Sequence, residues 1–177
     1  MSYKEEFKHI TTFVFDVDGV FTDGSITILP DGEMIRTMNT KDGYAVKAAL
    51  HAGFGVVIIS GGTNEAVRMR LNQLGIQDVY LGAHQKASIL HKYSKENSVP
   101  FENMLFMGDD IPDVEAMEMV RLGCCPNDAV PEVLASADYI SHKDGGKGCV
   151  RDVIEQVLKL QGKWGAQIGR ASCRERV

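Results

Sequence analysis

The sequence predicts an α/β domain built on a doubly wound parallel sheet. Short, nearly continuous apolar runs alternate with helical stretches, which is the pattern of a parallel sheet covered by helices on both faces. Residues rich in Asp, Ser and Gly follow directly after several of the apolar runs. The 177 residues suffice for about one domain, and no internal repeat, low-complexity tract or linker divides them.

Four apolar runs are expected as strands, at residues 12–15, 55–59, 78–81 and 104–107. Helices are expected at 42–52, 64–74, 84–97, 113–120 and 150–160. Residues 25–29 and 33–39 flank the turn signal Pro30-Asp31-Gly32, which predicts a β-hairpin inserted after the first strand. A two-stranded hairpin alone is marginal in water. Its apolar side chains are therefore expected to cover another surface: Ile26, Ile28, Leu29, Met34, Ile35 and Met38.

The composition is that of a soluble globular protein, with 44% apolar and 24% charged residues. The apolar run at 54–59 is far too short to span a bilayer, and residues 1–10 lack the apolar core of a signal peptide. Cys124, Cys125 and Cys149 show neither a disulfide framework nor zinc-ligand spacing. We therefore expect a cytoplasmic protein with no membrane partner.

The last ten residues, 168–177, differ from the rest of the chain because they are basic and match the translation of a sequencing adapter. A genuine disordered basic tail is the alternative. We predict one domain over residues 1–167 and a non-native, disordered tail over 168–177. The tail holds three arginines and one glutamate, so the remainder has 16 basic and 23 acidic residues and a net charge of −7. This acidic balance argues against nucleic acid as a partner.

The segment Asp16-Val17-Asp18-Gly19 directly follows the first expected strand. Ligands of open α/β sheets bind at this carboxyl edge. An aspartate there can attack phosphorus and form an aspartyl phosphate, so we predict Asp16 as the nucleophile. Asp18 can protonate the leaving oxygen and then activate water, while Gly19 lets the backbone turn away from the strand. These residues together predict phosphoryl chemistry.

Two further segments offer groups that would bind the phosphate. Ser60 and Gly61 follow the second expected strand and present a hydroxyl and backbone N–H groups to phosphate oxygens. Lys86 follows the third expected strand and offers a point charge to the same phosphoryl group. Phosphoryl transfer needs this combination of positioning and charge neutralisation.

The fourth expected strand is followed by Asp109, with Asp110 and Asp113 close behind. Together with Asp16 and Asp18, Asp109 is predicted to bind a cation, and Asp110 and Asp113 to support the site. Oxygen ligands beside a phosphate favour Mg²⁺ over zinc. The carboxylates could instead be helix caps and turn residues, and for Asp113 both interpretations stay open.

These four elements, in this order, resemble the haloacid dehalogenase superfamily. The resemblance implies a Rossmann-like, doubly wound sheet of that type. The 44 residues from Asp16 to Ser60 are used by the hairpin and one helix, and Lys86 and Asp109 are only 23 residues apart. Neither interval has room for the cap domain that many members carry. We therefore predict a domain without a cap.

Residues 39–43, 82–86 and 145–148, together with the hairpin, are similar to the 3-deoxy-D-manno-octulosonate 8-phosphate phosphatases. The similarity runs over about 10–164. It implies a sugar phosphate substrate of lipopolysaccharide biosynthesis and a homotetramer whose hairpins meet in a central barrel, with sites near subunit boundaries. It also implies that the Gly145-Gly146 segment belongs to a tail that closes the site.

The same resemblance implies a set of substrate contacts, some of which could instead be plain surface charges. These residues are Asn39, Thr40, Lys41, Asp42, Gly43, Lys47 and Arg70, together with Lys86. Gly62 departs from the arginine of many members and from the glutamate of a relative that acts on a nine-carbon keto-deoxy acid 9-phosphate. The eight-carbon and nine-carbon substrates therefore both remain open.

Two other classes of function are compatible with part of the pattern. A receiver domain also has a phosphoacceptor Asp at a strand end, an acidic pair, a Ser or Thr and a Lys. Receivers place the acidic pair before the acceptor and need no equivalent of Asp18, whereas here Asp109 and Asp110 come after Asp16. A silent binding subunit would be expected to lack Asp16, Asp18 or Asp109, and all three are present.

Overall fold

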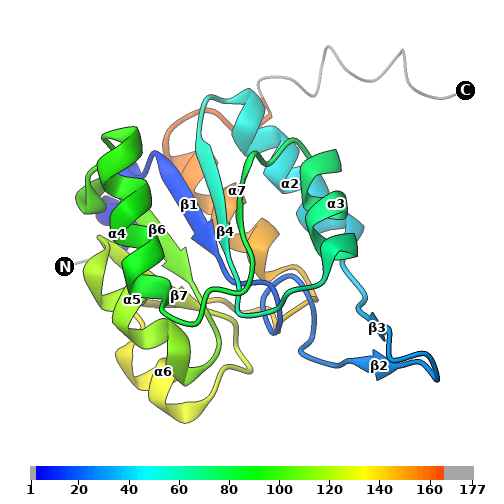
Figure 1. Ribbon diagram of the computed structural model, residues 1–177. Coiled ribbons are helices and arrows are strands. Elements are labelled where there is room, and N and C mark those ends of the chain that lie inside the picture. Colours follow the sequence, from blue (N-terminus) through cyan, green and yellow to red (C-terminus); the bar gives the residue numbers. More distant parts are fainter. Residues whose placement is uncertain (1–2, 166–177) are drawn as a thin grey trace, which may run out of the picture.

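The computed structural model describes residues 3–165, which form three layers with helices on both faces of a central sheet (Figure 1). The tail predicted over residues 168–177 lies outside the described residues. The sheet strands are β1 (Thr12–Phe15), β4 (Gly55–Ile59), β5 (Asp78–Tyr80), β6 (Met104–Met107), β7 (Leu122–Cys125) and β8 (Tyr139–Ile140). The α-helices are α1 (Tyr3–Glu6), α2 (Thr40–His51), α3 (Glu65–Gln73), α4 (Lys86–Asn97), α5 (Val114–Met119), α6 (Pro131–Ser136) and α7 (Cys149–Leu160). The 3₁₀ turns are η1 (Phe7–His9), η2 (Phe101–Asn103) and η3 (Ile111–Asp113).

The strands of the main sheet run in the order β5-β4-β1-β6-β7-β8, and every neighbouring pair is parallel. Numbered along the chain, this is the order 3-2-1-4-5-6 of a doubly wound sheet. The chain winds outward from β1 to β5 and then returns to β6 on the other side of β1. The predicted fold class is confirmed, and the reversal of strand order lies between β1 and β6.

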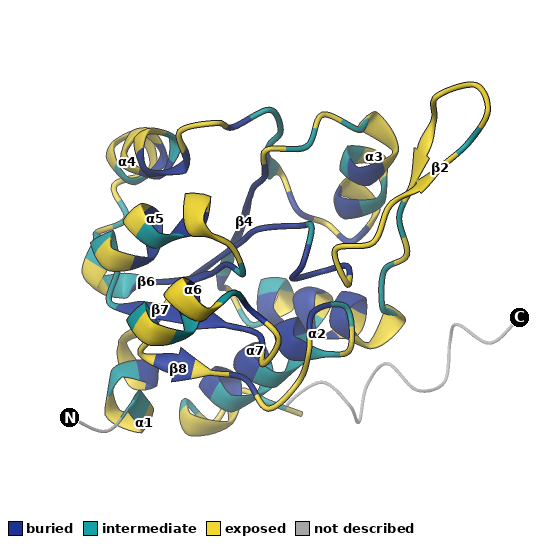
Figure 2. Ribbon diagram, turned by 90° about the horizontal axis from the view of Figure 1, so that it is seen from below, coloured by how far each residue is buried: buried dark blue, intermediate teal, exposed yellow. Residues whose placement is uncertain are grey.

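The strands in the middle of the sheet are buried on both faces. Phe13, Phe15 and Ile58 belong to the core beneath α2 and α7, whereas Val14 and Phe106 belong to the core beneath α4 and α5. Figure 2 shows this buried band between two helical layers whose outer sides are exposed. Burial of each such side chain stabilises the fold by about 1.5–3 kcal/mol. Within residues 3–165, no helix is long and apolar enough to cross a membrane.

The predicted elements differ from the structure mainly at their ends. Helix α2 begins at Thr40 rather than at residue 42, because Asn39 caps it by accepting a hydrogen bond from the Lys41 N–H at 2.9 Å. Helix α4 begins at Lys86, two residues later than predicted. The segment before it is a loop that bonds back to the residue after β4, with the Ala83 N–H donating to the Ser60 carbonyl at 2.9 Å.

Strands β7 and β8 and helix α6 were not predicted. The β7 sequence, Leu-Gly-Cys-Cys, has no β-branched or aromatic residue, and β8 has only two residues. Both strands lie on the side of the sheet farthest from β5. They extend the sheet beyond β6 and do not alter the site at β1.

The predicted hairpin is present but shorter than the ranges 25–29 and 33–39. Strands β2 (Thr27–Ile28) and β3 (Met34–Ile35) are antiparallel and pair Thr27 with Ile35 and Ile28 with Met34. The hairpin projects from the body near the edge toward which the β1 arrowhead points (Figure 1). Ile26, Ile28, Met34 and Ile35 are exposed, most of all Ile28 at 72%, whereas Leu29 and Met38 are half-buried.

Candidate active site

The predicted site residues meet at the carboxyl edge of the sheet, where the strand order reverses. Asp16 follows β1, Ser60 follows β4, and Asp109 follows β6 after one glycine. Lys86 reaches the same place from the first turn of α4. Crevices at such switch points are where open α/β sheets bind ligands. The side chains that the sequence separates by up to 93 positions, from Asp16 to Asp109, therefore lie at one place.

Lys86 is the centre of the buried cluster. Its Nζ lies 2.7 Å from Asp16 Oδ2 and 2.6 Å from Asp113 Oδ1, and the Lys86 side chain is only 5% exposed. Burial alone would lower the pKa of Lys86, but the charges of Asp16 and Asp113 outweigh it and hold that pKa above its ordinary value. Lys86 therefore stays charged and fixes the orientation of Asp16.

Asp113 organises the loop that carries Asp109. It is fully buried, and its Oδ2 accepts hydrogen bonds from the N–H groups of Asp109 at 3.1 Å and Asp110 at 3.3 Å. Asp110 and Asp113 also form a reciprocal capping box around η3. A Cβ at Gly108 would lie 2.3 Å from the Asp113 side chain, so this position has room only for glycine. Asp113 thus both caps a helical turn and holds Lys86, so the two interpretations left open by the sequence are compatible.

The carboxylates form a cluster whose charge exceeds that of the lysine. One oxygen each from Asp16, Asp109 and Asp113 lie within 4.8 Å of one another. Burial, followed by the charge of Asp113, raises the pKa of Asp16 to about 6 although Lys86 opposes the shift. Burial and the neighbouring aspartates raise the pKa of Asp109 to about 7. Hard oxygen donors with surplus negative charge suit Mg²⁺.

The residues present therefore fit a magnesium ion between Asp16 and Asp109. Asp113 is already bonded to Lys86 and to two backbone N–H groups, which suits a supporting role. Gly19 brings its backbone close to the same place: it has φ of +82°, and a Cβ there would lie 1.9 Å from Asp109 Oδ2. The turn after Asp18 and the Asp109 carboxylate are thus packed against each other.

The Asp18 carboxylate lies outside this cluster and pairs with Arg36, which was not predicted as a site residue. Arg36 Nε donates to Asp18 Oδ1 at 2.7 Å, and Nη2 donates to Oδ2 at 3.1 Å. The bond to Asp18 raises the pKa of Arg36 above its ordinary value. Arg36 follows β3, so the hairpin contributes directly to the site. The signal in the sequence that could have indicated Arg36 is a basic residue directly after the apolar Met34 and Ile35.

The loop expected to bind phosphate is rigidly tied to its neighbours. Ser60 is buried, and its Oγ accepts a hydrogen bond from the Gly62 N–H at 3.3 Å, which leaves its O–H free to donate. The Gly62 carbonyl accepts from the Gly82 N–H at 2.9 Å. Gly61 is exposed between them. This arrangement can present a hydroxyl and a backbone N–H to a phosphate on Asp16.

The residues expected to contact the sugar are dispersed over α2 and α3. Thr40, Lys41 and Lys47 are exposed on α2, and neither lysine ammonium forms an ion pair with a residue in the described part of the chain. Thr40 and Arg70 line one groove of about 540 Å³ between the hairpin and α3, which Arg36 and Met34 also line. The structure does not bring these side chains into the cluster around Lys86.

Three other residues of this set have contacts within the fold. Asp42 is fully buried and accepts a hydrogen bond from the Arg151 N–H at 2.8 Å, so its carboxylate is not accessible to a substrate in this conformation. Gly43 is buried where a Cβ would lie 3.0 Å from the Leu74 side chain. Asn39 donates to the Gly146 carbonyl at 3.4 Å. Their positions favour support of the site rather than direct contact.

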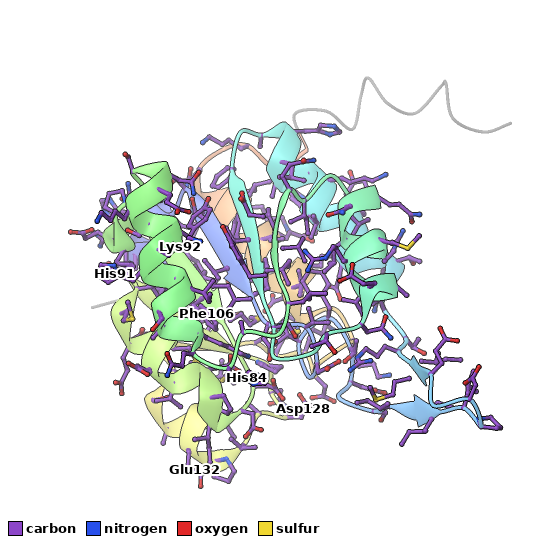
Figure 3. The ribbon with its side chains drawn as sticks, in the orientation of Figure 1. His84, His91, Lys92, Phe106, Asp128 and Glu132 are labelled. Atoms are coloured by element: carbon purple, nitrogen blue, oxygen red, sulfur yellow. The ribbon has the colours of Figure 1, made fainter. Side chains whose placement is uncertain are left out.

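The glycine-rich segment after β8 packs onto the turn that carries Asp18. A Cβ at Gly145 would lie 2.0 Å from the Gly19 carbonyl oxygen, and the Gly146 N–H donates to the Val20 carbonyl at 2.9 Å. Asp128 holds the segment by accepting from the Gly145 N–H at 2.9 Å. Figure 3 shows Asp128 near the edge where the strands end, with the exposed His84 on a loop at the same edge.

Comparisons with known proteins agree with this geometry. Residues 63–153 match the model of a family described as haloacid dehalogenase-like hydrolase. The 3-deoxy-D-manno-octulosonate 8-phosphate phosphatase of Salmonella typhi is 36% identical over 156 residues, which cover 88% of this chain and 83% of that protein.

Two solved structures show the same architecture. The 3-deoxy-D-manno-octulosonate 8-phosphate phosphatase of Moraxella catarrhalis, in complex with a magnesium ion, a phosphate ion and a KDO molecule, has a TM-score of 0.90 at 31% identity, covering 94% of this chain and 95% of that one. The cobalt-bound phosphatase of Haemophilus influenzae has a TM-score of 0.86 at 30% identity, covering 89% and 92%. The resemblance predicted from the motifs is confirmed, and a hydrolase is favoured over a receiver module.

Proposed function

Because this chain belongs to the 3-deoxy-D-manno-octulosonate 8-phosphate phosphatases, within the haloacid dehalogenase-like hydrolases, we propose that it hydrolyses that eight-carbon sugar acid phosphate. The reaction would release inorganic phosphate and the free sugar acid in the cytoplasm, for lipopolysaccharide biosynthesis. The observation that carries the proposal is the buried Lys86 that joins Asp16 to Asp113 at the switch point of the sheet. It presents an oriented carboxylate where a phosphate can bind.

The reaction starts at Asp16. Lys86 and the Val17 N–H, which donates to Asp16 Oδ1 at 2.6 Å, hold the carboxylate in one orientation. An Asp16 oxygen attacks phosphorus, the bond from phosphorus to the sugar oxygen breaks, and Asp18 donates a proton to that oxygen. Mg²⁺ held by Asp16 and Asp109 supplies positive charge that offsets the repulsion between the carboxylate and the phosphate. Ser60 binds the phosphoryl oxygens.

The second step regenerates the enzyme. Asp18, now ionised, accepts a proton from water as the water oxygen attacks phosphorus and the bond to Asp16 breaks. Inorganic phosphate leaves, and the electron pair of the broken bond stays on the Asp16 carboxylate. The same carboxylate thus serves as acid in the first step and as base in the second.

The sugar acid carries a second anionic group, for which the chain offers further cations. Lys41 and Lys47 are exposed on α2, and Arg70 faces the groove beside the hairpin. These groups are dispersed within one chain, so we propose that a neighbouring subunit helps to bring them over the substrate. The exposed apolar side chains of the hairpin, Ile28 and Met34 among them, supply the surface for a homotetramer.

A phosphate-release assay across a set of substrates tests the proposal. The set contains the eight-carbon and nine-carbon keto-deoxy sugar acid phosphates and the neutral glucose 6-phosphate, each with Mg²⁺ and with excess EDTA. We expect kcat/KM to be highest for the eight-carbon acid, and roughly 10–100-fold higher than for glucose 6-phosphate, because a charge-assisted pair contributes about 1.5–3 kcal/mol. Equal kcat/KM values, or full activity in EDTA, would overturn the proposal.

A further inference from the structure

Arg36 occupies both oxygens of the carboxylate that the proposed reaction needs as its acid and base. The fork of Nε and Nη2 meets Oδ1 and Oδ2 of Asp18 at 2.7 and 3.1 Å. The Arg36 side chain is only 6% exposed, whereas that of Asp18 is 31% exposed. Charge-assisted, bidentate pairs of this kind are among the strong polar contacts in proteins. Asp18 is therefore held in a defined orientation before any substrate arrives.

This pairing conflicts with the role of Asp18 in the first step. To protonate the leaving oxygen, Asp18 must turn a protonated carboxyl oxygen toward it, whereas each oxygen here accepts a hydrogen bond from Arg36, which fixes the orientation of both. The space enclosed by Asp18, Arg36, Ser60 and neighbouring residues has a volume of only about 10 Å³, no more than one water molecule needs. A sugar cannot reach Asp18 through this space while the pair is closed.

The surroundings of Arg36 allow the pair to open. The remaining Nη1 donates only to the Met34 carbonyl at 3.4 Å, which is a long hydrogen bond. The hairpin itself is a ladder of two residues in each strand. Arg36 also lines the groove of about 540 Å³ between the hairpin and α3, together with Asn64 and Arg70. An anionic group could approach the guanidinium from this groove.

We propose that Arg36 is a positioning residue that responds to the carboxylate of the substrate. In the free enzyme the guanidinium pairs with Asp18. On binding, it transfers to the substrate carboxylate, and Asp18 is freed to face the leaving oxygen. One bidentate pair with a carboxylate replaces another, so the exchange conserves hydrogen bonds and charge pairing. A phosphate ester without a carboxylate offers no such replacement, which deepens the proposed function by explaining how sugar acids are selected.

Substitution of Arg36 by glutamine tests this inference, with kcat and KM measured separately for the eight-carbon sugar acid phosphate and for glucose 6-phosphate. We expect kcat for glucose 6-phosphate to rise about tenfold, because Asp18 is no longer held, and kcat/KM for the sugar acid phosphate to fall roughly 10–100-fold, mainly through KM. R36K keeps the charge but loses the fork, so it should give smaller changes in the same directions.

A matched control is Arg68→Gln on α3, where the arginine pairs with Glu65 and lies outside the site. It should leave both substrates unaffected. A purely structural role for Arg36 predicts that R36Q lowers kcat for both substrates by the same factor, and that outcome, or no change for either, would overturn the inference. If the unmodified enzyme hydrolyses no sugar acid phosphate, the proposed function fails, and the kcat of R36Q on glucose 6-phosphate still decides whether Arg36 restrains Asp18.

Discussion

At the scale of single residues, the site brings three carboxyl groups together with only one ammonium group. Lys86 forms ion pairs with Asp16 and Asp113, but no cation forms an ion pair with Asp109 within the described residues. Burial and repulsion therefore raise the pKa of Asp109 to about 7 and that of Asp16 to about 6. A bound Mg²⁺ would favour the ionised forms of both groups. Metal affinity and proton affinity are consequently linked.

Magnesium affinity should fall as the pH falls. Without the ion, Asp109 is protonated below a pKa of about 7, and a protonated carboxyl must lose its proton before it can bind the metal. We expect the apparent dissociation constant of Mg²⁺, measured by titration calorimetry, to rise about tenfold per pH unit below about pH 7. In Asp109→Ala, most activity and the response to Mg²⁺ should both be lost. A dissociation constant that stays the same from about pH 8 to about pH 5.5 would contradict this linkage.

At the scale of elements, α2 holds the start of α7 and the glycine-rich segment before it. Helix α7 begins after Gly148, which has φ of +107° and no side chain to cap the helix. Asp42 from the first turn of α2 supplies the cap, and Asn39 bonds the Gly146 carbonyl. The segment in turn packs on Gly19, beside Asp18. A buried residue of α2 therefore supports the turn that carries Asp18, the proposed acid and base.

Burial of Asp42 should make the stability of the fold depend on pH. Its pKa is raised to about 6 by burial, although the Arg151 N–H opposes the shift, and its Oδ2 has no hydrogen-bond partner among the described residues. The folded state thus prefers the protonated form. The stability contribution is fully present below the unfolded pKa of about 4 and is lost as the pH rises toward about 6.

The Asp42→Asn variant isolates this effect. Asparagine keeps an acceptor for the Arg151 N–H but carries no charge, so the fall in the free energy of unfolding from about pH 4 to about pH 7 should shrink by roughly 2–3 kcal/mol relative to the unmodified protein. Asp42→Ala leaves that N–H unpaired and should be about 1–3 kcal/mol less stable than Asp42→Asn at all pH values. Urea denaturation at several pH values measures both. An identical pH profile in D42N would show that Asp42 is not the group responsible.

Helices and strands could be predicted from the sequence where their own residues show a clear apolar pattern. The central strands have continuous apolar runs, and β1, β4 and β6 were predicted to the residue. The strands β7 and β8 are held by pairing with a neighbour already in the sheet, which no local pattern reveals. Asp16, Ser60 and Asp109 could be predicted to lie together because each comes directly after, or one residue after, a parallel strand. Arg36 was missed because its contact with Asp18 spans 18 positions and depends on how the hairpin folds back.

At the scale of the whole molecule, assembly of several chains would both bury the apolar surface of the hairpin and cover the site. The hairpin exposes apolar side chains, Ile28 at 72% and Ile35 at 47%, and it stands beside a site with no covering domain among residues 3–165. Packing of hairpins from several chains would bury the apolar surface and shelter each site. This is the physical basis of the proposed homotetramer.

Charges placed on the hairpin should dissociate the assembly. In a variant with both Ile28→Asp and Met34→Asp, burying unpaired carboxylates would be costly, so light scattering should report a smaller species. Activity toward the sugar acid phosphate should fall far more than activity toward p-nitrophenyl phosphate, because only the larger substrate needs the neighbouring chain. Leu160→Asp, at the end of α7, is a control for adding charge at an exposed apolar residue. A fully active monomeric wild type would refute the shared site.

The central claim is that Asp16 becomes phosphorylated during turnover, and acid-quench peptide mass spectrometry tests it most directly. In Asp18→Asn, p-nitrophenyl phosphate can still phosphorylate Asp16 because its leaving group needs no proton. The water that removes the phosphoryl group then lacks its base, which slows that step by about 10²–10⁴-fold. We predict that the peptide containing Asp16 gains one phosphoryl group when Asp18→Asn is incubated with p-nitrophenyl phosphate and Mg²⁺. The same peptide should gain none when Asp16→Asn is added to that variant. An unmodified Asp16 peptide, or a phosphoryl group on any other residue, would contradict the mechanism.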